Sequence, residues 1–433
     1  MSKRLALLGG EKTRKELFNP YPIIGKKEKK EIMDVLSTGK LSGFIAQQGE
    51  YFLGGEKVRK LESDFNAYFK SKYAIAVNSA TAGLHATVAS LDIGPGDEVI
   101  VSPYTMSASA SAILMANAIP VFADIREDTY CIDPADIKRK ITPRTKAIII
   151  VHLFGQSANM DEIMAIAKKH KIAVIEDAAQ SPSATYRGRF TGVIGDVGIF
   201  SLNQHKTITT GEGGMILTNN RIIAEKARLI RNHGEVIKSN VKLGNIVNLL
   251  GWNYRMTELE AAVGIGQFGR LDFLTEYRIV LADYLTKELK KLNLPGIELP
   301  VISPENKHVY FLYPMKFKEK IIGIKRKTFI KAINAEGIPF GAGYVKPIYL
   351  EPMYQEKICY GKHGCPFKCS LYKGRIDYKK GICPVAERMH FKELIVTPMC
   401  KYSLKKKDIK DIVSAFKKIF NNIEPLRKLE QNR

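Results

Sequence analysis

The chain has 433 residues, of which 45% are hydrophobic, which is typical of a soluble protein with two packed domains. Its formal net charge of +23 suggests an anionic partner, but the basic clusters at 26–30, 316–327 and 405–410 lack interleaved aromatic residues, so we do not expect nucleic acid binding. No apolar run approaches the roughly eighteen residues of a membrane span and no signal peptide is recognisable, so we expect a cytoplasmic protein without a membrane segment.

Residues 1–55 are predicted to form an N-terminal arm. Within it, residues 28–36 have one apolar helical face, and Ser37-Thr38-Gly39 is typical of a helix end. The polar, glycine-bearing stretch 47–55 predicts a loop, and the amphipathic pattern of 58–69 predicts a helix.

Residues 56–295 are predicted to form a large α/β domain. Its strand-like apolar runs are 74–77, 99–101, 121–123, 147–151, 173–175 and 215–218. The helical segments among them include 81–91, 107–115, 160–170 and 222–231. Apolar strands without polar alternation, separated by helices, predict a mostly parallel sheet that is covered on both faces. Ligands bind at the carboxyl ends of the strands in such sheets, so the residues after each strand are candidates.

Three strand ends carry residues suited to a ligand. Asn78-Ser79-Ala80-Thr81 opens a helix, where backbone N–H groups either bind a phosphate or belong to an ordinary N-cap. Asp177 ends an apolar strand, so it is either paired with a cation or donor, or it is an N-cap or surface acid. Lys206 lies in a polar loop between Phe200-Ser201 and the turn Gly211–Gly214, and only these neighbours distinguish it from the other lysines.

A second, smaller α/β domain is predicted at 296–433, after an irregular, proline-bearing boundary near 293–304. Thr257 is predicted to cap the last helix that we assign before this boundary. The smaller domain is predicted to contain a strand at 309–315, a helix at 328–336, an irregular insertion at about 341–387, a strand at 394–397 and a closing helix at 408–420.

Six segments, in this order along the chain, resemble the DegT/DnrJ/EryC1/StrS family of pyridoxal-phosphate-dependent sugar aminotransferases. They are Gly94-Pro95-Gly96-Asp97-Glu98-Val99-Ile100-Val101, Val151-His152-Leu153-Phe154-Gly155, Glu176-Asp177-Ala178-Ala179-Gln180, Phe200-Ser201 with Lys206, Gly211-Glu212-Gly213-Gly214 and Asn253-Tyr254-Arg255-Met256. The resemblance runs from about residue 5 to 420. It implies the aspartate aminotransferase-like fold (fold type I) and a homodimer with active sites at the subunit interface.

The resemblance also implies roles for individual residues toward pyridoxal 5′-phosphate (PLP). Lys206 would bind PLP covalently as a Schiff base and then move a proton, and Asp177 would pair with the ring nitrogen. Gln180 would lie near the ring hydroxyl. The phosphate would be held by Ser201, Ala80 and Thr81 and, from the other subunit, by Asn253. Met106 stands where the family usually stacks an aromatic residue on the PLP ring.

The substrate prediction rests on departures within the family. Some members have histidine at the position of Lys206 and dehydrate sugars, so the lysine here favours amino transfer, with glutamate or glutamine as the donor. Phe311 lies near a position that is often histidine in members acting on nucleotide-linked sugars. Cys383-Pro384-Val385-Ala386-Glu387-Arg388 and the insertion before it look more like the branch with scyllo-inosose aminotransferases and aminohydroxybenzoate synthases.

We therefore expect a nucleotide-activated keto sugar as the substrate, with a keto-cyclitol as the second hypothesis. Two less favoured hypotheses are a PLP-dependent sugar dehydratase and a non-catalytic regulatory protein on the same scaffold.

Four of the six cysteines fall within a short stretch, Cys359, Cys365, Cys369 and Cys383. We expect reduced thiols because no secretion signal is recognisable. The spacing lacks paired Cys-x-x-Cys units, so we expect no metal, although a tetrahedral thiolate site is a weaker alternative, with His363 as a possible substitute ligand.

Overall fold

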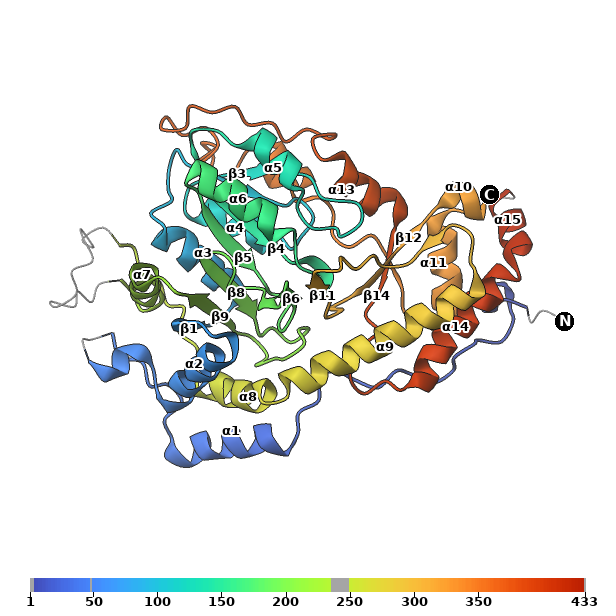
Figure 1. Cartoon of the computed structure of the whole chain (residues 1–433), viewed down its shortest axis with the longest axis horizontal. Coiled ribbons are helices and arrows are strands. Elements are labelled where there is room, and N and C mark those ends of the chain that lie inside the picture. The colour runs from blue at the N-terminus through green and yellow to red at the C-terminus, as the bar shows by residue number, and fades with distance from the viewer. Residues whose placement is uncertain (1–3, 47–48, 235–248, 432–433) are drawn as a thin grey trace.

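The computed structural model describes residues 4–46, 49–234 and 249–431, and the structural statements below concern these ranges. The sequence after Asn232-His233-Gly234 predicts a polar loop, which lies largely outside these ranges, as does a small part of the loop predicted at 47–55. Two sheets with separate hydrophobic cores dominate the molecule, and the longest helix joins them (Figure 1). Within the described ranges, every helix is too short or too polar to cross a membrane.

The larger sheet has seven strands in the order β1-β9-β8-β5-β4-β2-β3. Their bounds are β1 (Tyr73–Val77), β2 (Glu98–Val101), β3 (Ile119–Phe122), β4 (Thr145–Val151), β5 (Ala173–Asp177), β8 (Val197–Ser201) and β9 (Gly214–Thr218). Within this sheet, as far as the structure describes it, β9 runs opposite to the other six strands, so the predicted, mostly parallel sheet is confirmed. The six strands predicted from apolar runs all belong to this sheet.

Helices cover this sheet because its strands are apolar on both faces. They are α2 (Glu56–Phe69), α3 (Ala80–Ser90), α4 (Ala108–Met115), α5 (Pro134–Lys140), α6 (Met160–His170), α7 (Arg221–Arg231) and α8 (Glu258–Phe268). Thr257 caps α8 as predicted, since its hydroxyl oxygen accepts the Glu260 N–H at 3.2 Å while Glu260 Oε2 accepts the Thr257 N–H at 2.8 Å.

The smaller sheet has the order β10-β12-β14-β13 and is antiparallel throughout. Its strands are β10 (Ile297–Glu298), β12 (Tyr313–Phe317), β13 (Gly341–Ala342) and β14 (Leu394–Thr397), and its helices are α10 (Glu319–Ile322), α11 (Arg326–Ala335), α14 (Lys406–Phe420) and α15 (Ile423–Gln431). Helix α9 (Leu271–Leu292), which we did not predict, places Leu274 in a core of the larger sheet and Leu285 in that of the smaller one.

The strand predicted at 309–315 is wrong in its first half, because strand β12 begins only at Tyr313. The preceding backbone bonds to a loop instead: the Val309 N–H donates to Gly155 O at 2.9 Å and the Phe311 N–H to Phe154 O at 2.8 Å. Tyr310 has a φ of +49°, which is incompatible with a continuous strand. This turn places Phe311 beside Lys206.

The N-terminal arm runs from the smaller sheet to the larger one (Figure 1). Its first part, with the short helix η1 (Ala6–Leu8), is bound by the buried carboxylate of Glu336, which accepts the N–H groups of Ala6 and Thr13 at 2.8 and 2.9 Å and the Lys418 ammonium at 2.8 Å. Burial alone would raise the pKa of Glu336, but the Lys418 ammonium and the N–H donors outweigh it and lower this pKa below its usual value of 4.5.

The second part of the arm packs on the large domain. Helix α1 (Lys26–Thr38) ends at Gly39, as its sequence predicts, and lies along α8, where Glu28 Oε1 accepts the Gln267 amide at 2.7 Å. The short helix η2 (Glu50–Leu53) follows and buries Phe52.

The insertion at 341–387 packs against the edge of the larger sheet at β3. The Tyr378 hydroxyl donates to Pro120 O at 2.7 Å, and Tyr354 and Tyr378 contact the Phe122 ring edge-on. The insertion contains η5 (Ile348–Leu350), α12 (Pro352–Gln355) and α13 (Pro384–Arg388), and the π-helix η6 (Met389–Glu393) follows it. A three-stranded sheet of β6 (Thr185–Tyr186), β7 (Arg189–Phe190) and β11 (Asn306–Lys307) lies apart from both large sheets.

Candidate active site

The carboxyl ends of β1 and β8 meet the start of β9 at the opening of helix α3. Gly214, the first residue of β9, pairs with Val77 at the end of β1 and with Ser201 at the end of β8. A Cβ atom on Gly214 would lie 2.6 Å from the Ala80 nitrogen, so only glycine allows this close approach. Ser201 is thereby placed next to the first turn of α3.

Both interpretations of the segment 78–81 find support. Ser79 is the N-cap of α3, since its hydroxyl oxygen accepts the Ala82 N–H at 3.1 Å. The N–H groups of Ala80 and Thr81 lie in the first turn, where a helix offers them no acceptor. Together with the positive end of the helix dipole, they can bind an anionic group such as a phosphate.

Lys206 is half-buried in the turn between β8 and β9. Its ammonium lies 4.8 Å from the centroid of the Phe311 ring, and it makes no hydrogen bond or ion pair with any described residue. Burial lowers the pKa of Lys206, and the negative charge of Asp177 opposes this only in part. A buried amine with a lowered pKa is a better nucleophile at neutral pH than an exposed lysine.

Asp177 ends β5 and is 5% exposed. Its Oδ2 accepts the Ser109 hydroxyl at 2.8 Å and its Oδ1 accepts the Ala179 N–H at 3.2 Å. These donors compensate the burial of a carboxylate and do not carry a positive charge, so Asp177 can still pair with a cationic ring nitrogen. Ser109 was missed by the sequence analysis, although it lies in the first turn of the helix after β2.

The neighbouring acid, Glu176, has a structural role. It points to the other face of the strand, where it accepts the His152 ring N–H at 2.8 Å and the N–H groups of Gly192 and Ile194 at 2.8 and 2.6 Å. His152 Nδ1 accepts the Ala158 N–H at 3.2 Å, which assigns the ring proton to Nε2. This pair holds the end of β5 in place.

Gln180 is also buried close to Asp177. Its Oε1 accepts the Phe154 N–H at 2.9 Å and its Nε2 donates to the Tyr344 hydroxyl at 2.9 Å. Tyr344 was not predicted as a site residue. The contact joins positions that are 164 residues apart, and no local pattern indicates it.

Met106 and Asn253 lie at the edge of this group. Met106 is 51% exposed, and its carbonyl accepts the Ser109 N–H at 3.3 Å, which places it one turn from the Asp177 partner. Asn253 is exposed, and its carbonyl accepts the Asn78 amide at 3.3 Å, so it lies beside the start of α3 of its own chain.

The structure does not bring the cysteines of the weaker alternative, a tetrahedral thiolate site, together within the described ranges. All six cysteines are free, and no three His, Cys, Asp or Glu side chains of the described ranges come together as a metal site. Cys383 is buried with its thiol toward Phe122 O at 3.9 Å, whereas Cys365 is exposed. The aromatic packing of the insertion on β3 therefore separates the cysteines.

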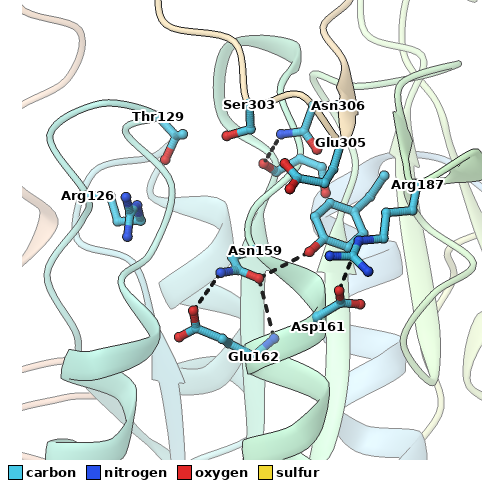
Figure 2. A pocket seen from close by; sticks show the side chains of 11 residues that line it. Arg126, Thr129, Asn159, Asp161, Glu162, Arg187, Ser303, Glu305 and Asn306 are labelled. Atoms are coloured by element: carbon cyan, nitrogen blue, oxygen red, sulfur yellow. Dashed lines mark hydrogen bonds and ion pairs between the residues drawn. The ribbon is translucent and has the colours of Figure 1, made fainter.

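A cavity of about 300 Å³ lies between α6, the β6–β7 hairpin and the segment 303–306 (Figure 2). Its charged and polar groups bind one another: Arg187 Nε is 3.1 Å from Asp161 Oδ2, and the Tyr186 hydroxyl donates to Asn159 Oδ1 at 3.2 Å. None of the candidate cofactor residues lines it. We therefore do not assign the cofactor to this cavity.

Comparison with known proteins agrees with this geometry. The family model of the DegT/DnrJ/EryC1/StrS aminotransferase family matches residues 42–376. GDP-perosamine synthase from Caulobacter vibrioides is 38% identical over 69% of this chain and 79% of its own length. L-glutamine:scyllo-inosose aminotransferase from Streptomyces griseus is 30% identical over 98% of this chain and 99% of its own length.

Among solved structures, DesV from S. venezuelae, in complex with a ketimine intermediate, superposes with a TM-score of 0.75 at 30% identity and covers 91% of this chain and 94% of its own. The resemblance inferred from the sequence is therefore confirmed, as is the fold. The residues of the site also fit PLP: a half-buried lysine whose amine has no hydrogen-bond partner in the described part of the chain, the carboxylate of Asp177, whose charge acts on that lysine, and N–H donors at a helix start next to Gly214. The chain thus belongs to the DegT/DnrJ/EryC1/StrS aminotransferase family, as a PLP-dependent sugar or cyclitol aminotransferase.

Proposed function

We propose that this enzyme transfers an amino group from glutamate or glutamine to the keto group of a nucleotide-activated sugar. The observation that carries the proposal is the environment of Lys206: a half-buried amine of lowered pKa, without a hydrogen-bond partner in the described part of the chain and influenced by the charge of Asp177. Amino transfer needs a lysine that can bond covalently to the cofactor and later accept and return a proton.

The other residues supply binding and orientation. PLP, when bound, supplies an electron sink for the bonds at the amino-bearing carbon. Asp177 would hold the ring nitrogen protonated, and Gln180 would lie at the ring oxygen. The phosphate would be held by Ser201 and by the N–H groups at Ala80 and Thr81, beside Gly214.

Two further roles complete the proposed site. The Met106 side chain would pack on the ring face, where a thioether contributes favourable contacts with an aromatic system. Asn253 would reach the phosphate of a partner subunit in a homodimer with shared active sites. Asn253 is exposed, which is compatible with such a contact.

Lysine at position 206 also separates amino transfer from dehydration. A lysine amine forms a covalent bond to PLP and is displaced by the amino donor, whereas an imidazole can act only as a base. His205 precedes the lysine and does not replace it.

A keto-cyclitol is a second candidate substrate, and one observation favours it. The scyllo-inosose enzyme aligns over 98% of this chain, whereas GDP-perosamine synthase aligns over only 69%. A panel of nucleoside-diphosphate keto sugars and scyllo-inosose, assayed with glutamate and glutamine, distinguishes the two. Amination of scyllo-inosose alone would overturn the sugar-nucleotide proposal and leave the chemistry intact.

The covalent role of Lys206 is tested by spectroscopy. The purified protein should be yellow with PLP, and borohydride should fix the cofactor to the chain at Lys206. Lys206→Ala should abolish both the visible band and the fixation. Lys226→Ala, which removes a lysine bound to Asp92 on the surface, is the control and should behave like wild type. A band that persists in Lys206→Ala would refute the role.

A further inference from the structure

Tyr344 connects the smaller sheet to the candidate cofactor site. It follows β13, and its hydroxyl oxygen accepts the Gln180 Nε2–H at 2.9 Å. The other end of the Gln180 amide is fixed as well, since its Oε1 accepts the Phe154 N–H at 2.9 Å. A backbone N–H can only donate, so Oε1 faces Phe154 and the amide nitrogen faces Tyr344.

The Tyr344 side chain is itself held rigidly. Its backbone N–H donates to the Tyr104 hydroxyl oxygen at 2.9 Å, and Tyr104 is fully buried. The Tyr344 ring meets the Phe154 ring edge-on with centroids 5.2 Å apart. Gly343, just before it, has a φ of +71°, and a Cβ there would lie 2.7 Å from His390 O. The hydroxyl therefore occupies one position relative to β5.

Two hydrogens of this network are unused. The Gln180 amide nitrogen carries two hydrogens and gives one to Tyr344. The Tyr344 hydroxyl accepts that hydrogen, and its own finds no acceptor among the described residues. Burial, together with the nearby charge of Asp177, raises the pKa of Tyr344 to about 12, so it is a neutral donor at pH 7.

Tyr344 and Lys206 both lie close enough to Asp177 for its charge to act on their titration. A role for this network in catalysis rests on the proposed function, because it takes Gln180 to lie at the ring oxygen of PLP.

We propose that Tyr344 is a positioning residue: it locks the Gln180 amide so that its second hydrogen is donated to the ring oxygen of PLP. A hydrogen bond to an anionic oxygen favours its charged form. The PLP ring oxygen, stabilised as an anion by Gln180, would then attract less strongly the proton that it would share with the Lys206 nitrogen. Removing the Tyr344 hydroxyl frees the amide to rotate, so the PLP-loaded protein should titrate at a higher pH.

The test is a pH titration of the visible absorption band of the PLP-loaded, full-length protein. Tyr344→Phe should raise the midpoint by about one unit, which is about 1.4 kcal/mol. Tyr378→Phe is the matched control, because it removes another buried tyrosine hydroxyl, bound to Pro120 O in the insertion, and should leave the midpoint unchanged. In a Gln180→Ala background, Tyr344→Phe should add no further shift, because it acts only through Gln180.

A Tyr344→Phe midpoint equal to that of wild type, with PLP bound, overturns the proposal and leaves the proposed function intact. A full shift that persists in the Gln180→Ala background also overturns it, because Tyr344 would then act directly. If Tyr344→Phe does not fold, Tyr104→Phe loosens the same network and should raise the midpoint by about half a unit; no change would overturn the proposal. A wild-type protein that forms no visible band would instead refute the proposed function.

Discussion

Gly214 is the residue whose replacement best tests the phosphate site. In Gly214→Ala, the new Cβ would lie 2.6 Å from the Ala80 nitrogen and 2.7 Å from the Ser79 carbonyl carbon. Ordinary contact begins at 3.4 Å, so the start of α3 would have to move by about 0.8 Å. The clashing atoms are backbone, so no side-chain rotation can relieve the contact.

The displacement should lower the unfolding free energy and weaken the binding of PLP. Overpacking of this kind costs about 1–3 kcal/mol of unfolding free energy. A shift of about 0.8 Å also stretches the N–H contacts of Ala80 and Thr81 to a phosphate beyond normal hydrogen-bond length. Each charge-assisted bond contributes about 1.5–3 kcal/mol, so the loss of one or two should raise the Kd for PLP about 100-fold.

The assay is fluorescence titration of the apoprotein with PLP, together with urea unfolding. Gly94→Ala is the matched control, because it also has no positive φ and its Cβ would meet only Ala116 O at 3.9 Å. Gly94→Ala should change neither the Kd for PLP nor the free energy of unfolding appreciably. A Gly214→Ala protein that is folded and binds PLP within twofold of wild type would refute the placement of the phosphate at α3.

Three further changes test the electrostatics. Ser109→Ala removes a hydrogen bond to Asp177, so the Kd for PLP should rise about tenfold in fluorescence titration, and an unchanged Kd would contradict the proposed pairing. Phe311→Ala admits water to Lys206, so the pKa of Lys206 should rise. The pH profile of PLP association with the apoprotein should then move to higher pH. A profile that does not move would show that Phe311 does not desolvate Lys206. Glu336→Gln should lower the free energy of unfolding at pH 7, measured by urea unfolding, by about 3 kcal/mol. Because the folded pKa of this carboxyl is lowered, its stabilisation is present above pH 4.5 and lost below it, so the two proteins should converge in acid, and a constant difference would argue against the ion pair.

The sequence was sufficient for features that depend on local pattern. The apolar run 147–151 lies within β4, and the helix at 160–170 has the bounds of α6, because burial periodicity and caps are written in neighbouring residues. Strands β5 and β8 are parallel neighbours, so the predicted parallel order places Asp177 and Ser201, at their carboxyl ends, at the same edge of the sheet.

Features set by distant contacts could not be predicted. Ser109 and Asp177 are 68 residues apart, and their bond depends on how two strand ends meet. The apolar run at 309–315 suggested a strand, but bonds to the loop after β4 override its local preference.

Helix α9 has a consequence for how the enzyme loses its structure. Its 22 residues span about 33 Å, and its two halves are embedded in different cores. If the smaller core melted alone, Leu281, Leu285 and Leu289 would be exposed on a helix still anchored at its other end, at a cost of about 1.5–3 kcal/mol for each leucine. Melting of the smaller core alone is therefore disfavoured, and we expect the two cores to unfold together and the cofactor to be released only then.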